Sequence, residues 1–322
     1  LSKAEEEGAE ILTGEVFDIV TNELGKPVVK YRESHEIQFA DLSMEADFVV
    51  FAGGVNQTPG MNLKSDPLFG ALRRAIPGMR PPKVRRSLIC ELAVDEDAIR
   101  PLDGELHFAQ YGSKDLKIEM SSLIPKAEVI TVVLLGPSVD TTDRSGNASI
   151  VRRFLQLPHI RRLLPAKLDI NPVCMCNPNM TVGAARRPFG QRIALIGDMV
   201  VSRLYKDGIL SAYQTATALA DCILYTGVDR ESLKRGYWPV IRQFGRDVWF
   251  GRVVFLLSRI TFSNPILSRI LYQAVLTERK TRLQHNRRLG MLLWRIASGD
   301  DSYERILAAM FHPATLGRIA IG

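Results

Sequence analysis

The chain has 322 residues, of which 46% are hydrophobic and 24% are charged, an ordinary globular composition. This length is enough for two packed units or one elaborate domain. No run approaches the roughly 18 consecutive apolar residues that cross a bilayer, and the N-terminus lacks the basic and apolar segments of a secretory signal. Membrane-spanning and secreted proteins are therefore disfavoured classes.

The formal net charge of +7 is concentrated in one part of the chain. Residues 230–297 carry fourteen Lys or Arg and three Asp or Glu, so they contribute +11 and the remainder −4. This asymmetry predicts that residues 230–297 contact an anionic membrane surface peripherally. A helical cap with solvated arginines is the alternative of similar weight. Nucleic acid is not predicted as a partner, because no recognised binding motif accompanies the charge.

Cysteine and histidine are sparse in the sequence. The four cysteines are too few and too scattered for a disulfide framework, which favours a reducing cytoplasm. Cys174 and Cys176 could be a redox pair, but a disulfide across one intervening residue is strained, so a structural role is favoured. The five histidines never approach one another at metal-ligand spacing, and we predict no metal site.

The N-terminal third predicts a helix end followed by strands. Residues 1–9 are typical of the end of an amphipathic helix closed by Gly8, which suggests that the sequence begins inside a longer chain. Residues 10–20 and 27–31 are β-branched runs separated by a turn, and they predict a hairpin. Residues 45–52 form a short apolar run before two glycines, as expected of a buried parallel strand that ends in a tight turn.

The middle of the chain predicts a separate antiparallel sheet. Residues 56–82 are rich in Pro, Gly and Asn and contain one amphipathic patch, so they are predicted to be a crossing segment. The strands that follow are spaced as in an antiparallel sheet and are predicted at residues 86–93, 104–110, 116–120 and 129–135.

The second half predicts mostly helices around one further strand. Helices are expected at 148–157 and 159–164, and a buried strand at 190–198. An alanine-rich helix follows from 208 to 224, with small residues suited to close packing. The remaining chain is predicted to be helical throughout.

The strand that ends at Gly197 and Asp198 carries the most informative chemistry. Gly197 permits a sharp backbone turn, and Asp198 can accept hydrogen bonds from sugar-type hydroxyls. The amides at the helix start near Gly208 would face an anion. This order predicts a nucleotide-cofactor site, and the alternative is an aspartate that merely caps the next helix.

This stretch, with the loop Ser202–Gly208, resembles the Gly-Asp motif of the flavoprotein superfamily that contains geranylgeranyl reductases, aromatic hydroxylases and lycopene cyclases. In that family the aspartate matching Asp198 binds the ribityl or diphosphate part of FAD. The amides after the position of Gly208, beginning at Ile209, approach the flavin ring. The resemblance therefore implies FAD as the cofactor.

Two departures from the family pattern bear on the flavin ring. Met199 stands where relatives often have alanine, and Leu210 stands where a second glycine is frequent. Ring contacts are therefore less sharply implied than those to the ribityl chain. Candidate polar groups near the ring are Arg203, Tyr205 and Lys206, with a solvated surface loop as the alternative.

A second segment, Asp47–Asn56, resembles the family's Asp-x-Val-Val-x-Ala-Asp-Gly signature, with Gly53 in place of the second aspartate. The resemblance implies that Ala52, Gly53 and Gly54 also contribute to cofactor binding, and an ordinary strand and turn is the alternative.

No segment supplies the Gly-x-Gly-x-x-Gly turn of a first βαβ unit. We therefore expect the complete protein to extend upstream.

Together these features predict an α/β fold in which a split FAD-binding Rossmann-like domain lacks its first βαβ unit. An antiparallel β-sheet substrate domain is inserted into it, and a helical region follows. The predicted segments are 1–60 for the first part of the FAD domain, 61–189 for the substrate domain, 190–226 for the return of the FAD domain and 227–322 for the helices.

The resemblance implies a FAD-dependent oxidoreductase that acts on carbon-carbon double bonds of an apolar, isoprenoid or lipid-like substrate. NAD(P)H or ferredoxin would be the electron donor. No catalytic side chain is assigned, because the flavin itself carries the hydride. The alternatives are a FAD-dependent monooxygenase or halogenase-like enzyme, and a non-catalytic membrane-associated scaffold that has lost the cofactor.

Overall fold

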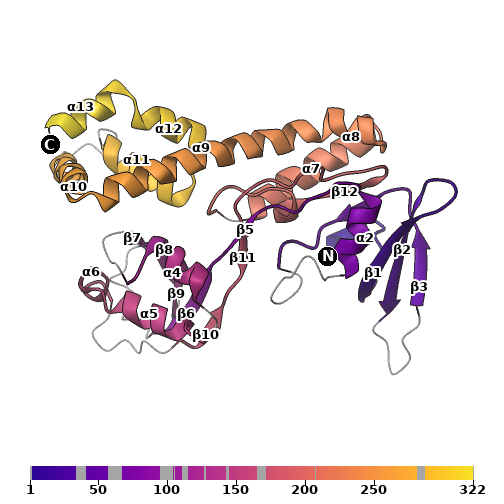
Figure 1. Ribbon diagram of the computed structural model, residues 1–322, viewed down its shortest axis with the longest axis horizontal. Coiled ribbons are helices and arrows are strands. Elements are labelled where there is room, and N and C mark those ends of the chain that lie inside the picture. Colours follow the sequence, from indigo (N-terminus) through magenta and orange to yellow (C-terminus); the bar gives the residue numbers. More distant parts are fainter. Residues whose placement is uncertain are drawn as a thin grey trace. The chain divides into compact units, whose positions relative to one another are not determined.

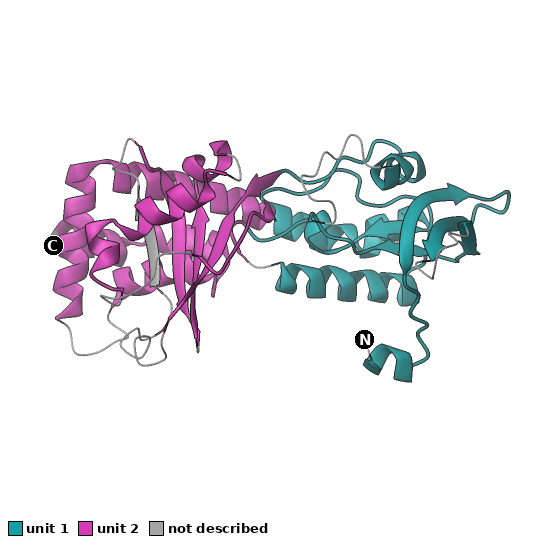
Figure 2. Ribbon diagram, turned by 90° about the horizontal axis from the view of Figure 1, so that it is seen from below, with its two compact units in different colours: residues 1–83, 181–203, 207–245 teal, residues 84–180, 204–206, 246–322 magenta. Residues whose placement is uncertain are grey.

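The computed structural model describes residues 2–33, 41–56, 67–94, 104, 106–110, 115–126, 128–142, 145–164, 172–206, 208–280 and 287–321. These residues belong to two compact units, coloured teal and magenta in Figure 2. Unit 1 comprises residues 1–83, 181–203 and 207–245, and unit 2 comprises residues 84–180, 204–206 and 246–322. Each unit therefore combines segments that are far apart in the sequence.

A three-stranded antiparallel sheet forms one part of unit 1, in the order β1-β2-β3 (Figure 1). The short helix α1 (Ser2–Glu6) precedes it, and its strands are β1 (Gly14–Thr21), β2 (Pro27–Glu33) and β3 (Asp41–Glu45). In the β1–β2 turn, Asn22 Oδ1 accepts hydrogen bonds from the amides of Leu24 and Lys26. Gly25 adopts a φ of 74° there, which glycine tolerates without strain.

A parallel pair of strands forms the centre of unit 1. β4 (Val49–Phe51) pairs with β12 (Ile193–Leu195), and all three residues of β12 are buried. The helices of unit 1 that accompany these strands are α2 (Pro67–Ala75), α7 (Ile209–Tyr225) and α8 (Arg230–Gly236). The buried hydroxyl of Tyr237 donates a 2.7 Å hydrogen bond to the carbonyl of Leu195, which ties β12 to the chain that follows α8.

Unit 2 contains a five-stranded antiparallel sheet in the order β10-β6-β9-β8-β7. The strands are β6 (Leu88–Ala93), β7 (Leu106–Gln110), β8 (Ile118–Pro125), β9 (Val129–Leu135) and β10 (Cys174–Cys176). Two further short strands, β5 (Val84–Arg86) and β11 (Asn179–Thr181), pair with each other. The helices on this part of the chain are α4 (Pro137–Thr141), α5 (Asn147–Leu155) and α6 (Pro158–Arg161).

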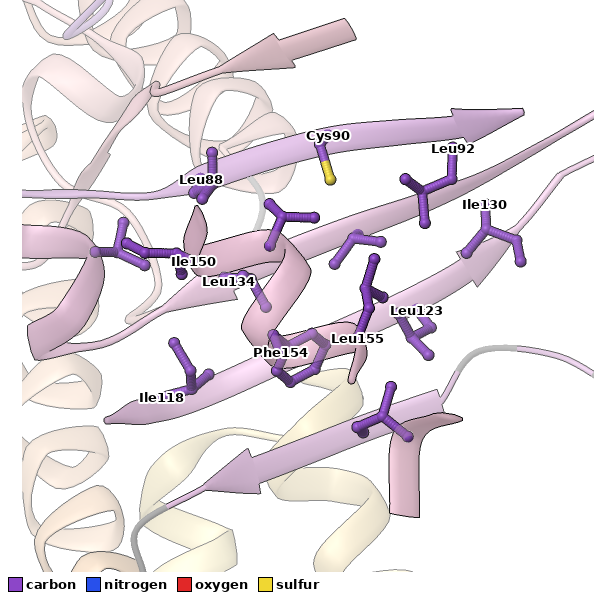
Figure 3. Close-up of a cluster of buried hydrophobic side chains, with 14 of the residues drawn as sticks. Leu88, Cys90, Leu92, Ile118, Leu123, Ile130, Leu134, Ile150, Phe154 and Leu155 are labelled. Atoms are coloured by element: carbon purple, nitrogen blue, oxygen red, sulfur yellow. The ribbon is translucent and has the colours of Figure 1, made fainter. Parts of the chain in front are cut away.

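The core of unit 2 lies between this sheet and α5 (Figure 3). Phe154 and Leu155 of α5 are fully buried against strand residues such as Leu88, Ile118 and Leu134. Burying one such side chain contributes about 1.5–3 kcal/mol, so this cluster is a main source of stability for the unit.

The C-terminal part of the chain is helical. α9 (Trp238–Ser263) begins in unit 1, and its residues from Arg246 onward belong to unit 2. Asn264 caps the next helix by accepting hydrogen bonds from two amides in its first turn. The helices that follow α9, all in unit 2, are α10 (Pro265–Arg279), α11 (Arg288–Ser298), α12 (Tyr303–Met310) and α13 (Pro313–Ile321).

The structure confirms a mixed α/β chain with an antiparallel sheet and a helical C-terminal region. The predicted burial of the strand in 45–52 is wrong on one side, because Val50 is 43% exposed. The contact-based units also group the chain differently from the predicted segments. Residues 67–83 belong to unit 1, and residues 246–321 belong to the unit that holds the antiparallel sheet. The predicted boundary at 60 lies outside the described residues.

Candidate functional site

The two segments predicted to bind the cofactor lie side by side in unit 1. β4 and β12 are parallel, with Val49 opposite Ile193 and Phe51 opposite Leu195. The amide of Ile196 continues the ladder by donating a 3.0 Å hydrogen bond to the Phe51 carbonyl. The carboxyl ends of the two strands therefore share one edge, which is where parallel sheets bind ligands. This places residues 52–54 beside residues 197–198.

The Asp198 carboxyl group lies between two of the predicted glycines. Gly54 has a φ of +69°, and a Cβ at this position would lie 3.1 Å from Asp198 Oδ1. A Cβ at Gly208 would lie 3.7 Å from the Asp198 Cβ. The backbone amide of Val55 donates a hydrogen bond to the same carboxylate. The structure thus brings Gly54, Asp198 and Gly208 together, and glycine is required at the first of these positions.

Burial raises the pKa of Asp198 above its ordinary value, and hydrogen bonds from the amides of Val55, Asp198 and Met199 counteract part of this effect. A carboxylate in this setting gains from additional donors, because its charge is only partly solvated. Ligand hydroxyls are suitable donors of this kind.

The turn that presents Asp198 is fastened to α7. Gly197 has a φ of +70°, and its amide donates a 2.8 Å hydrogen bond to Thr215 Oγ1. Thr215 Oγ1 in turn donates to the Ser211 carbonyl. On the other side, Thr181 Oγ1 donates to the Asp198 carbonyl. These bonds hold the acidic turn in a fixed position relative to the start of α7.

The start of α7 is the third component of the site. Gly208 is the residue before the first helical turn, and Ile209 is 79% exposed. A helix of this length carries partial positive charge at its N-terminus, which favours an anion. The Ser211 hydroxyl in the first turn is fully buried and has no hydrogen-bond partner within the described ranges. Such a buried polar atom is unusual in a folded protein.

A cleft of about 620 Å³ runs along β4 in unit 1. One wall is the strand itself and its continuation through Ala52 and Gly53. The remaining lining residues come from β1, β2 and α2 and are Gly14, Glu15, Val16, Ile19, Val29 and Leu68. The cleft presents polar and apolar surface in similar amounts, and its lining residue Gly53 directly precedes Gly54.

The three polar residues predicted near a flavin ring have different surroundings. Arg203 is half-buried in unit 1, whereas Tyr205 and Lys206 belong to unit 2. The Tyr205 hydroxyl accepts a 2.7 Å hydrogen bond from Arg85, and its ring packs against Phe255. Lys206 Nζ donates to backbone carbonyls at the C-terminal end of α11. Their proximity to a flavin ring stays a prediction.

Sequence reasoning missed the groups that hold the acidic turn in place. Thr181 gives no local signal, because its contact with Asp198 depends on a fold that joins two distant segments. Thr215 could have been found, since Ser211 and Thr215 are four residues apart on a helix otherwise rich in alanine.

The residues present fit the ribityl hydroxyls of FAD. Gly54 and Gly208 leave space around Asp198 that a side chain would fill, and the Asp198 carboxylate can accept hydrogen bonds from hydroxyls. The site lacks a glycine-rich Gly-x-Gly-x-x-Gly turn for the adenine-side diphosphate, because the sequence contains none.

Comparison with known proteins shows the same fold in flavoproteins. No protein-family model matches the chain, and no curated protein is significantly similar in sequence. The flavin-dependent halogenase CmlS matches 100% of this chain with a TM-score of 0.53 and 16% identity, but the match covers only 52% of CmlS. A flavoprotein/dehydrogenase from Cytophaga hutchinsonii gives a TM-score of 0.55 at 15% identity, over 100% of this chain and 72% of the other.

A variant of the halogenase PltM in complex with FAD gives a TM-score of 0.55 at 15% identity, over 96% of this chain and 61% of that one. The chain therefore spans about half to two thirds of the length of these halogenases. At such identities the likeness shows the fold alone. The flavoprotein resemblance of the sequence is confirmed at this level, and the geranylgeranyl-reductase subgroup stays a prediction.

Proposed function

We propose that this protein is a FAD-dependent oxidoreductase of the monooxygenase or halogenase-like type. The observation that carries this proposal is the position of Asp198 between Gly54 and Gly208, at the shared carboxyl edge of β4 and β12. The solved flavoproteins of the same fold support it, and one of them is recorded with FAD.

When bound, FAD would supply the redox chemistry of the reaction. The protein's own task is then to position the cofactor. Asp198 would accept hydrogen bonds from the ribityl hydroxyls, and Gly54 would let the cofactor approach the backbone. The N-terminus of α7 would stabilise the diphosphate charge. Apolar side chains that line the cleft along β4, such as Val16 and Leu68, would pack against whatever part of the cofactor or substrate the cleft holds.

Reduction of carbon-carbon double bonds in an isoprenoid or lipid-like substrate is the second candidate. The loop Ser202–Gly208 favours it, because this loop resembles reductase-like members of the superfamily. NAD(P)H or ferredoxin would then be the electron donor. The two candidates differ in their use of oxygen. A monooxygenase with reduced FAD should consume oxygen only when a phenol is added. A reductase should saturate the double bonds of an isoprenoid alcohol in the absence of oxygen.

Titration of the purified chain with FAD, followed by quenching of flavin fluorescence, tests the proposal. Asp198→Ala should weaken binding about 10- to 100-fold, because it removes a charged hydrogen-bond acceptor. Asp221→Ala is the matched control, since Asp221 is exposed on α7 and lies outside the site. FAD that binds equally well to both variants would contradict the proposal and favour the scaffold alternative.

A further inference from the structure

An exposed apolar stripe runs along the part of α9 that belongs to unit 2. Trp249, Leu256 and Ile260 are 57%, 53% and 52% exposed. A residue in an α-helix is rotated by about 100° from the one before, so spacings of seven and four place these three side chains on one face. The opposite face is buried, as Gly251 and Val254 show. α9 is therefore apolar on both its inner and its outer side.

The next helix continues this apolar surface. α10 follows α9 after a bend of 99° at Asn264, whose side chain caps its first turn. Ile266 and Ile270 are exposed and lie one turn apart on α10. The α9–α10 stripe is defined here as Trp249, Leu256, Ile260, Ile266 and Ile270.

Within the segment that carries the stripe, the charged residues all have one sign. From Val248 to Thr277 the only charged residues are Arg252, Arg259 and Arg269, and all three are exposed. Arg259 also pairs with Glu119, yet its side chain stays 53% exposed. On a helical wheel, Arg252 and Arg259 lie beside the face that carries Trp249 and Leu256.

The two acidic residues that bound this segment are turned into the protein. Asp247 accepts a 2.7 Å hydrogen bond from the Tyr303 amide. Glu278 is buried, and its carboxylate accepts hydrogen bonds from the amides of Leu289 and Gly290 at the start of α11. Both acidic groups of this segment are therefore engaged by backbone amides.

The shape and chemistry of the stripe match an interfacial helix better than a spanning one. Among the described helices, none is by itself long and apolar enough to cross a bilayer. Only α9 and α10 taken together have the necessary length and composition, and they are bent by 99° where they meet. Soluble monomers rarely leave such apolar stripes exposed. Arginines can extend from the helix to lipid phosphates while their stems cover apolar surface, and tryptophan favours the headgroup level.

We propose that the α9–α10 stripe with its three flanking arginines binds an anionic lipid surface, with both helices lying on the bilayer. The apolar side chains enter the boundary between headgroups and acyl chains, and the arginines contact lipid phosphates and carboxylates. This binding does not depend on the proposed FAD site, because the two involve different residues.

Flotation of the full chain with vesicles tests the proposal. One set of vesicles is pure phosphatidylcholine, and the other contains 30% phosphatidylserine, about the fraction that gives a clearly negative surface. The chain should float with the anionic vesicles and stay at the bottom with the neutral ones. The variant Arg252→Gln/Arg269→Gln should bind the anionic vesicles about fivefold more weakly for each arginine removed. The variant Leu256→Gln/Ile260→Gln should lose more affinity than that, because it removes two apolar side chains of the stripe.

Two control variants make the same chemical changes elsewhere. Arg73→Gln/Arg152→Gln removes equal charge from exposed positions on α2 and α5, and Leu24→Gln/Leu224→Gln changes two exposed leucines, in the β1–β2 turn and on α7. Both should bind like the wild type. Equal loss in stripe and control variants, or no flotation with either vesicle, would overturn the proposal. So would wild-type self-association in light scattering that Leu256→Gln/Ile260→Gln abolishes, because the stripe would then join two copies.

Discussion

The glycine beside Asp198 shows how one residue type can determine a binding site. Gly54 is constrained in two ways, by a φ of +69° and by the 3.1 Å that would separate its Cβ from the Asp198 carboxylate. Gly25 in the β1–β2 turn has a similar φ of +74°, but no atom lies within 4 Å of its Cβ position. The two glycines thus share a backbone requirement, and only Gly54 has a crowded neighbour in the site.

This difference gives a prediction with an internal control. Gly54→Ala and Gly25→Ala should each lower the free energy of unfolding by about 1–2 kcal/mol, because alanine is strained at positive φ. Only Gly54→Ala should also weaken FAD binding. Urea unfolding and flavin fluorescence titration of both variants measure the two effects. Equal FAD affinity in the two variants would show that the space beside Asp198 is not used by the cofactor.

At the scale of elements, unit 2 is stabilised by an ionic cluster as well as by its apolar core. Glu119 of β8 is 7% exposed, and its carboxylate accepts hydrogen bonds from Arg85 of β5 and Arg259 of α9. Arg85 also bonds Asp140 of α4. Interactions with these two carboxylates raise the pKa of Arg85 and outweigh the opposing effect of burial. The cluster therefore links two strands and two helices.

Removing the central carboxylate should be costly, because the largely buried Arg85 then loses one of its two carboxylate partners and Arg259 loses its pair as well. Glu119→Ala should lower the free energy of unfolding by about 3 kcal/mol or more. Glu304→Ala breaks the exposed ion pair with Arg246 and should lower the free energy of unfolding by less than about 1 kcal/mol. Urea unfolding of both variants checks the ranking. A similar small loss for both would mean that the cluster contributes little net stability.

For the whole molecule, local patterns predicted the elements better than their arrangement. The apolar runs before Gly53 and Gly197 predicted both strands of the site, and the acidic turn followed from Asp198. Their pairing was not legible, because Val49 and Ile193 are 144 residues apart and share no local pattern. Only the family resemblance placed the two segments in one domain.

Other features had no signal in the sequence. β3, β10 and β11 were not predicted, since these strands are only three to five residues long and lack a clear alternation of apolar residues. The association of residues 246–321 with the antiparallel sheet depends on long-range contacts, as between Arg259 and Glu119. The sequence predicted a basic surface in residues 230–297, but it did not predict the exposed apolar stripe of α9. Periodicity alone cannot distinguish a buried apolar face of a helix from an exposed one.

Hydrogen–deuterium exchange of the chain with and without FAD tests the central claim most directly. If the acidic turn and the start of α7 hold the cofactor, FAD should slow exchange in peptides that cover residues 51–56 and 196–210. The five-stranded sheet of unit 2 should exchange at an unchanged rate. Protection that appears elsewhere while these two segments stay unchanged at saturating FAD would contradict the assignment of the site.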